Sequence, residues 1–125
     1  MGLTHVAVQL RSAGSKRTYN ADFLVDTGAF DSLAPASLLR EIGVEPVGKR
    51  TYELANGKLQ EYEFGLAELT FLDEIVATRI IFGPDDAEPL LGVVALESAG
   101  FLVDPNSQTL RKPRAFPLKM AVSAK

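Results

Sequence analysis

FLVDTGAFDSLAP, residues 23–35, is the segment that decides how the chain is interpreted. Its apolar start predicts a strand, and the triplet DTG at residues 26–28 ends that strand. Asp26 therefore emerges at the edge of a core rather than in a solvated loop. Gly28 permits unusual dihedral angles and a close approach of another backbone, and Ala29 leaves room beside the carboxylate. This pattern favours a chemical role for Asp26, although an Asp at a strand end can also simply cap a turn.

A single carboxylate in this position has no obvious reaction to perform, whereas two carboxylates a few ångströms apart do. Like charges that close cannot both ionise, so the pair shares one proton and can act as base and acid together. The sequence contains one DTG triplet. A second aspartate would therefore come from a second copy of the chain, related by a two-fold axis.

Composition narrows the class of protein. The chain has 125 residues, which indicates one domain, and 46% of them are hydrophobic, which is enough for a core. It has no cysteine, which excludes a disulfide framework, a thiol nucleophile and a cysteine-based zinc site. The net charge of −3 does not indicate a nucleic-acid surface.

The distribution of apolar residues also bears on location. No window approaches the length of a membrane-spanning helix, and the N-terminal residues are too polar for a signal peptide. We therefore expect a cytoplasmic protein that is not bound to a membrane.

Most of the chain predicts strands separated by turns, with few helical segments. The pair Asn56-Gly57 favours a tight hairpin turn, and Pro35 and Gly43 suit the first turn and the end of a helix. The expected strands are residues 4–10, 18–25, 51–55, 58–69, 75–82, 101–105 and 108–112, and the expected helices are residues 34–42 and 93–100.

The last segment differs in composition from the rest. Residues 113–125 are basic, contain Pro113 and Pro117, and follow a stretch in which Asp104 is the last acidic residue. We interpret residues 1–112 as the domain and residues 113–125 as a C-terminal tail, which is either loose or laid along another surface.

Four short motifs in order now suggest a family. LVDTGA at 24–29, LANG at 54–57, LLGVVALE at 90–97 and FLVDP at 101–105 resemble retropepsin-like aspartic proteases, in particular the small single-lobe bacterial and archaeal type. The resemblance covers roughly residues 3–112. It implies an all-β closed retropepsin-type barrel with one or two short helices, an active homodimer, a protein or peptide substrate, and no metal or other cofactor.

The resemblance also assigns roles to individual residues. It makes Asp26 catalytic, and it gives Thr27 the role of a hydroxyl that braces the dimer, for which a local hydrogen bond is the alternative. The implied site is completed by the active-site loop residues Gly28 and Ala29, the flap residues Ala55, Asn56 and Gly57, and the loop support Leu91 and Gly92.

Three features lie outside that pattern. Viral members of the family often carry an Asp and an Arg that pair near the dimer interface, where this chain has Phe30 and Val93. Asp31 is a candidate substrate contact, or it binds its own backbone. The acidic stretch around Asp85 lacks the spacing of a metal loop and is interpreted as solvated.

The sequence thus predicts an aspartic endopeptidase that hydrolyses peptide bonds with water activated by an aspartate dyad. A dimeric module that binds an extended peptide without cutting it is the alternative on the same fold. A structural subunit of a larger assembly is a third hypothesis, and it predicts no affinity for peptides.

Overall fold

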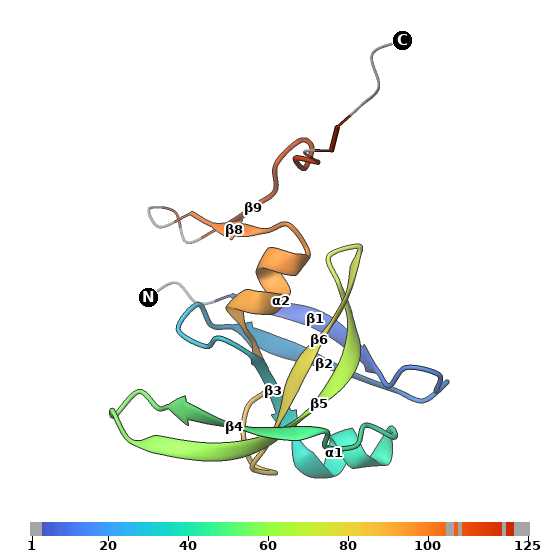
Figure 1. Cartoon of the computed structure of the whole chain (residues 1–125), viewed down its shortest axis with the longest axis vertical. Coiled ribbons are helices and arrows are strands. Elements are labelled where there is room, and N and C mark those ends of the chain that lie inside the picture. The colour runs from blue at the N-terminus through green and yellow to red at the C-terminus, as the bar shows by residue number, and fades with distance from the viewer. Residues whose placement is uncertain (1–3, 105–106, 108, 119, 122–125) are drawn as a thin grey trace.

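Strands dominate the computed structural model (Figure 1), which describes residues 4–104, 107, 109–118 and 120–121. The strands are β1 (His5–Arg11), β2 (Thr18–Val25), β3 (Ser32–Pro35), β4 (Gly48–Glu53), β5 (Leu59–Phe71), β6 (Glu74–Gly83), β7 (Leu90–Leu91), β8 (Leu102–Val103) and β9 (Leu110–Arg111). The helices are α1 (Ala36–Glu41) and α2 (Val93–Ser98).

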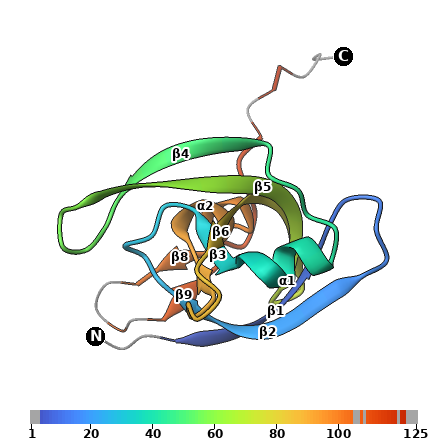
Figure 2. The same ribbon diagram turned by 90° about the horizontal axis from the view of Figure 1, so that it is seen from below.

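The main sheet closes on itself in a ring. Within the described residues its order is β1-β2-β7-β3-β6-β5-β4, and β1 also pairs with β5. This second pairing places Leu10 opposite Leu69 and joins the two ends of the ring. β4 pairs with β5 and extends the sheet beyond the ring, as Figure 2 shows from below. The predicted all-β fold with one or two short helices is confirmed.

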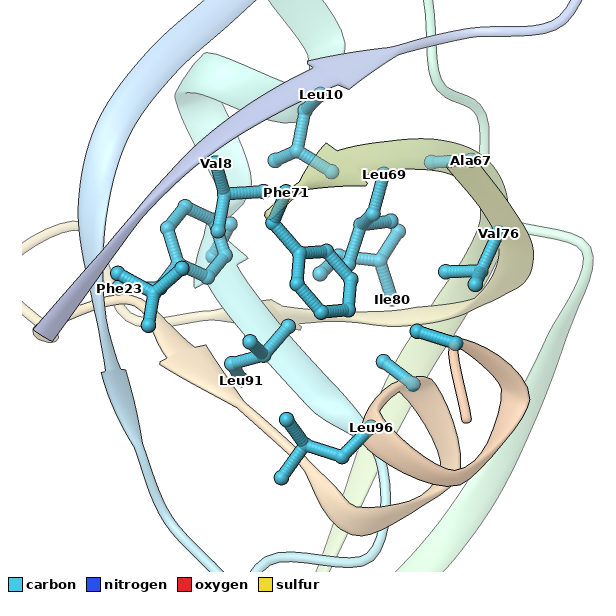
Figure 3. Packing of buried hydrophobic residues seen from close by; sticks show 14 of the residues in the cluster. Val8, Leu10, Phe23, Ala67, Leu69, Phe71, Val76, Ile80, Leu91 and Leu96 are labelled. Atoms are coloured by element: carbon cyan, nitrogen blue, oxygen red, sulfur yellow. The ribbon is translucent and has the colours of Figure 1, made fainter. Parts of the chain in front are cut away.

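The core fills the inside of this ring because the strands alternate in polarity. In β1 every second side chain is buried, so Val8 and Leu10 face inward while their neighbours face solvent. They meet Phe23 of β2 and the buried side chains of β5 (Figure 3). Each large apolar side chain that is fully buried contributes about 1.5–3 kcal/mol. The apolar core thus stabilises the ring together with the hydrogen bonds between neighbouring strands.

Helix α1 begins later than predicted. Ala34 and Pro35 were expected in the helix, but they belong to β3, where they pair with Phe82 and Gly83 of β6. Pro35 stands at the N-cap of α1 and offers no side-chain cap. Sheet pairing therefore outweighs the local preference of proline for the first turn of a helix.

Helix α2 and the hairpin after it lie at one end of the ring (Figure 1). Ala95 and Leu96 bury the inner face of α2 against the core, and Gly100 ends the helix as predicted. β8 and β9 then form the predicted pair of short strands, although their turn lies partly outside the described residues. Beyond them the ring of Phe116 lies against Gly100.

Among the described residues, no helix is long and apolar enough to cross a membrane.

Candidate active site

Asp26 is the first residue after β2, and its backbone is fixed on one side by β7. The Asp26 N–H donates a hydrogen bond to the carbonyl of Leu91 over 3.0 Å, just beyond the parallel pairing of β2 with β7. On the other side, the Val25 N–H donates to the carbonyl of Thr4. The strand end that carries the carboxylate is therefore set between two neighbouring segments.

The loop after Asp26 turns back on the carboxylate. The Gly28 N–H donates to Asp26 Oδ1 over 2.9 Å, and the Ala29 N–H donates to the Asp26 carbonyl over 3.1 Å. A Cβ at Gly28 would lie 3.2 Å from the same Oδ1, which is a tight contact. Asp26 Oδ2 has no hydrogen-bond partner among the described residues, so one oxygen of the carboxylate can accept a bond from water or substrate.

Residues 92–94, at the start of α2, support this loop through hydrogen bonds. The Val93 N–H donates to the carbonyl of Ala29 over 2.8 Å, and the Val94 N–H donates to the carbonyl of Phe30 over 3.1 Å. The Gly92 N–H donates to the buried hydroxyl of Ser32. A Cβ at Gly92 would lie 2.7 Å from the carbonyl carbon of Asp31, so the two segments touch through backbone alone.

Two side chains of the loop face outward. Thr27 is exposed, and within the part of the chain that the structure describes its hydroxyl has no hydrogen-bond partner. Phe30 is 57% exposed although it is a large apolar side chain. One polar and one apolar side chain are therefore exposed next to the half-buried carboxylate of Asp26.

The predicted flap is a hairpin formed by β4 and β5. Its last ladder pair is Glu53 with Leu59, and the Leu54 N–H then donates to the carbonyl of Lys58, which leaves residues 55–57 as the turn. The Gly57 N–H donates to the carbonyl of Leu54. Gly57 has a φ of 84°, so the turn is a three-residue loop with a left-handed last residue rather than the tighter two-residue type. Asn56 Oδ1 accepts the Lys58 N–H over 2.9 Å. Ala55 and its two neighbours in the turn are exposed.

The flap tip and the active-site loop project to the same side of the molecule. Both views agree on this, with the β4–β5 turn and the β2–β3 connection at the left of Figures 1 and 2.

Asp31 is buried rather than open to the solvent. Its side chain is 0% exposed, and its Oδ2 accepts hydrogen bonds from Tyr52 Oη over 2.7 Å and Arg50 Nη1 over 3.2 Å. Burial raises the pKa of the Tyr52 hydroxyl, and the hydrogen bond and negative charge of Asp31 raise it further. Sequence reasoning missed this connection, although Arg50 and Tyr52 occupy alternate positions of one strand.

The acidic residues between β6 and β7 contact different partners. Asp85 Oδ1 accepts the Ser37 N–H at the start of α1, and Glu88 pairs with His5 over 2.8 Å. Among the described residues, no three side chains of the types His, Cys, Asp and Glu gather closely enough to hold a metal ion.

Comparison with known proteins agrees with the geometry of this loop. Residues 8–94 match the model of the aspartyl protease family, which is more than half of the chain. The chain therefore belongs to the aspartyl protease family, and it is retropepsin-like. The matched range contains the strand that ends at Asp26, the flap hairpin and the segment around Gly92. No curated protein matches the chain significantly.

Proposed function

We propose that the protein is an aspartic endopeptidase whose active form is a homodimer, with Asp26 of each subunit in one catalytic dyad. The observation that carries this proposal is the position of Asp26. It follows the end of a strand whose Phe23 and Val25 are buried in the core, one of its oxygens is held by the Gly28 N–H, and the other has no partner among the described residues. Membership of the aspartyl protease family supports the same reaction.

The two carboxyl groups would share one proton and divide the work of hydrolysis. The ionised carboxylate takes a proton from water while the water oxygen bonds to the carbonyl carbon of the peptide. The protonated carboxyl group gives its proton to the carbonyl oxygen. When the C–N bond of this tetrahedral intermediate breaks, the leaving nitrogen takes a proton from the carboxyl group that received it from water, and the other carboxylate takes a proton from a hydroxyl of the intermediate. The dyad thereby regains its single shared proton, and no covalent enzyme intermediate forms.

The dimer is proposed because one chain supplies one such aspartate. Thr27 supports it, because its exposed hydroxyl has no partner within the described part of the chain and could reach a second copy. The exposed ring of Phe30 supports it too, since a partner or a substrate would cover that ring. An extended peptide would lie between the loops and the flap hairpins and be held by main-chain hydrogen bonds, as an added strand is.

The residues to which the family resemblance assigns a role would act as follows. Gly28 and Ala29 would leave room for the substrate backbone, Leu91 and Gly92 would support the loop, and Ala55 with its neighbours would form the flap tip. Residues 1–112 would form the protease domain and residues 113–125 the tail. The substrate would be a protein or peptide.

Cleavage of a peptide library, read by mass spectrometry from about pH 4 to pH 8, tests the proposal. Wild type and Asp26→Asn are compared at two protein concentrations. We expect cuts from wild type alone, with a rate that rises faster than linearly with concentration because the dimer is the active species.

The competing function is a dimer that binds peptides without cutting them. The absence of the Asp–Arg pair at Phe30 and Val93 favours it, because that pair helps to fix the dimer in viral members. A wild-type dimer that holds peptides intact in the same assay would establish this function instead.

A further inference from the structure

The three residues Asp31, Arg50 and Tyr52 form a buried contact that joins the flap to the active-site loop. The carboxylate of Asp31 has no exposed surface, and a buried charge is unfavourable unless charged or polar partners surround it. Its partners are the Tyr52 hydroxyl and the Arg50 guanidinium, and both donate to Oδ2. Within the described residues the other oxygen, Oδ1, has no partner, so all side-chain bonds of Asp31 run to β4.

These partners both come from the strand that leads to the flap tip. In β4 the inward-facing residues alternate with exposed ones, which places Arg50 and Tyr52 on one face. Among the described strands, β4 pairs with β5 alone. The contact with Asp31 is therefore a second attachment of this strand, and it reaches the loop without passing through β5.

On the loop side, Asp31 is fixed relative to the catalytic strand. Its carbonyl group lies against Gly92, and the next residue, Ser32, accepts the Gly92 N–H. The carbonyl of Phe30 accepts the Val94 N–H just before it. A shift of β4 would therefore move Asp31, and a shift of Asp31 would disturb the backbone contacts that support Asp26.

Aromatic rings hold the donors in place. The Arg50 guanidinium lies 5.9 Å from the ring centres of both Phe30 and Phe64. The Tyr52 and Tyr62 rings are 6.2 Å apart and tilted. The raised pKa of the Tyr52 hydroxyl keeps its proton in place, so it remains a donor to Asp31.

We propose that Asp31, Arg50 and Tyr52 act as a flap latch that holds β4 against the active-site loop and thereby positions the flap for cleavage. The inference rests on the proposed protease function. Tyr52 and Arg50 are positioning residues in it, because they act on the flap through Asp31 and contact no reacting atom. A weaker latch populates flap positions that bind the substrate poorly.

Hydrogen exchange of the full-length protein tests the latch without depending on activity. The experiment compares Asp26→Asn with Asp26→Asn/Tyr52→Phe, since inactive chains cannot digest themselves. We expect exchange in residues 48–58 to become about tenfold faster, because a hydrogen bond to a charged group is lost. Exchange in β1 and in the inner half of β5 should not change.

Tyr62→Phe is the matched control. Its ring packs against Tyr52, but its hydroxyl has no hydrogen bond to the described residues, so exchange in the flap should stay as it was. A double-mutant cycle with Asp31→Asn then identifies the partner of Tyr52. Once Asp31 is changed, Tyr52→Phe should add much less than tenfold. If Asp31→Asn does not fold, Arg50→Met replaces it, and its coupling to Tyr52→Phe reports the acceptor that both donors share, Asp31 Oδ2.

Kinetics of the active enzyme complete the test. Tyr52→Phe should lower kcat/KM about tenfold, mainly through KM, because the hydrogen bond holds the flap in its binding position. Unchanged exchange in the flap, or faster exchange throughout the core, would overturn the latch. Faster flap exchange with unchanged kinetics would overturn its positioning role. If wild type cuts no peptide, the protease proposal and that role both fail, whereas exchange still decides whether strand and loop are tied.

Discussion

The active-site loop and the flap tip are both turns between strands, yet they are held in opposite ways. The loop after Asp26 rests on backbone bonds from residues 92–94 and on a glycine that has no space for a side chain. The tip around Gly57 is exposed, and a Cβ there would meet nothing within 4 Å. One turn is fixed by close packing and the other by its own local hydrogen bonds. The proposed protease would need this division, because its reacting groups must stay fixed while a long peptide enters.

The largest effect expected on the rigid side comes from Asp26 itself. Asp26→Asn keeps an oxygen that can accept the Gly28 N–H, so the fold should survive, but the amide cannot act as a base. Cleavage should fall by about 10²–10⁴-fold, measured as kcat on a peptide found in the library. Asp22→Asn, at an exposed position of the same strand, is the control and should cleave normally. Full activity of Asp26→Asn would rule out the dyad.

The packing of the loop predicts the next effect. Gly92→Ala places a Cβ 2.7 Å from the carbonyl carbon of Asp31, where backbone rather than a flexible side chain must move. We expect a loss of about 1–3 kcal/mol in the free energy of unfolding, measured by urea denaturation. A midpoint equal to that of wild type would mean that the loop is not held in this way.

The corresponding change at the flap tip should be milder. Gly57→Ala introduces no clash but forces alanine to adopt a φ of 84°. The expected loss is about 1–2 kcal/mol, again in the free energy of unfolding. Gly57→Asn serves as the control, and it should lose less because asparagine tolerates this conformation. A larger loss at Gly57 than at Gly92 would reverse the comparison between the two turns.

The smallest effect concerns a cap that lies outside both turns. The Ser37 N–H at the start of α1 holds the pKa of Asp85 below its usual range. Because the folded pKa is the lower one, the stabilisation is full above the pKa of the unfolded chain and disappears as pH falls through the folded value. Asp85→Ala should therefore lower the unfolding temperature at about pH 6, and this effect should shrink steadily as the pH falls below about 4. The control is Asp86→Ala. If the difference in unfolding temperature between wild type and Asp85→Ala grew as the pH was lowered, the cap would be contradicted.

The contrast between the two turns also explains what the sequence could predict. Asp26 and Gly57 stand in short local patterns, a strand that ends at DTG and an asparagine-glycine pair, so their positions follow from neighbours in the chain. The turn between β5 and β6 has no such pattern. Leu72 and Asp73 both take positive φ there, and leucine rarely adopts this conformation. The pairing across the sheet imposes that turn.

Long-range contacts were the other limit on prediction. Asp31 meets Tyr52, 21 residues further along the chain, and no local pattern links them. The sequence suggested a substrate contact or a local bond for Asp31, whereas its side chain contacts the flap strand instead. Pro35 shows the same limit, because pairing with β6 draws it into β3 despite its preference for a helix start.

The closure of the ring has a consequence for how the chain matures. β1 is the first strand to be synthesised and β5 is synthesised much later. The ring can close only when Leu69 is available to pair with Leu10. Sheets joined by such distant partners fold slowly. A chain that has not yet folded offers accessible segments, and an accessible extended segment is the form of peptide that the proposed protease would accept. Newly made copies would then compete with other substrates for the folded enzyme. A chain that folds faster would be exposed to cleavage by folded copies for a shorter time.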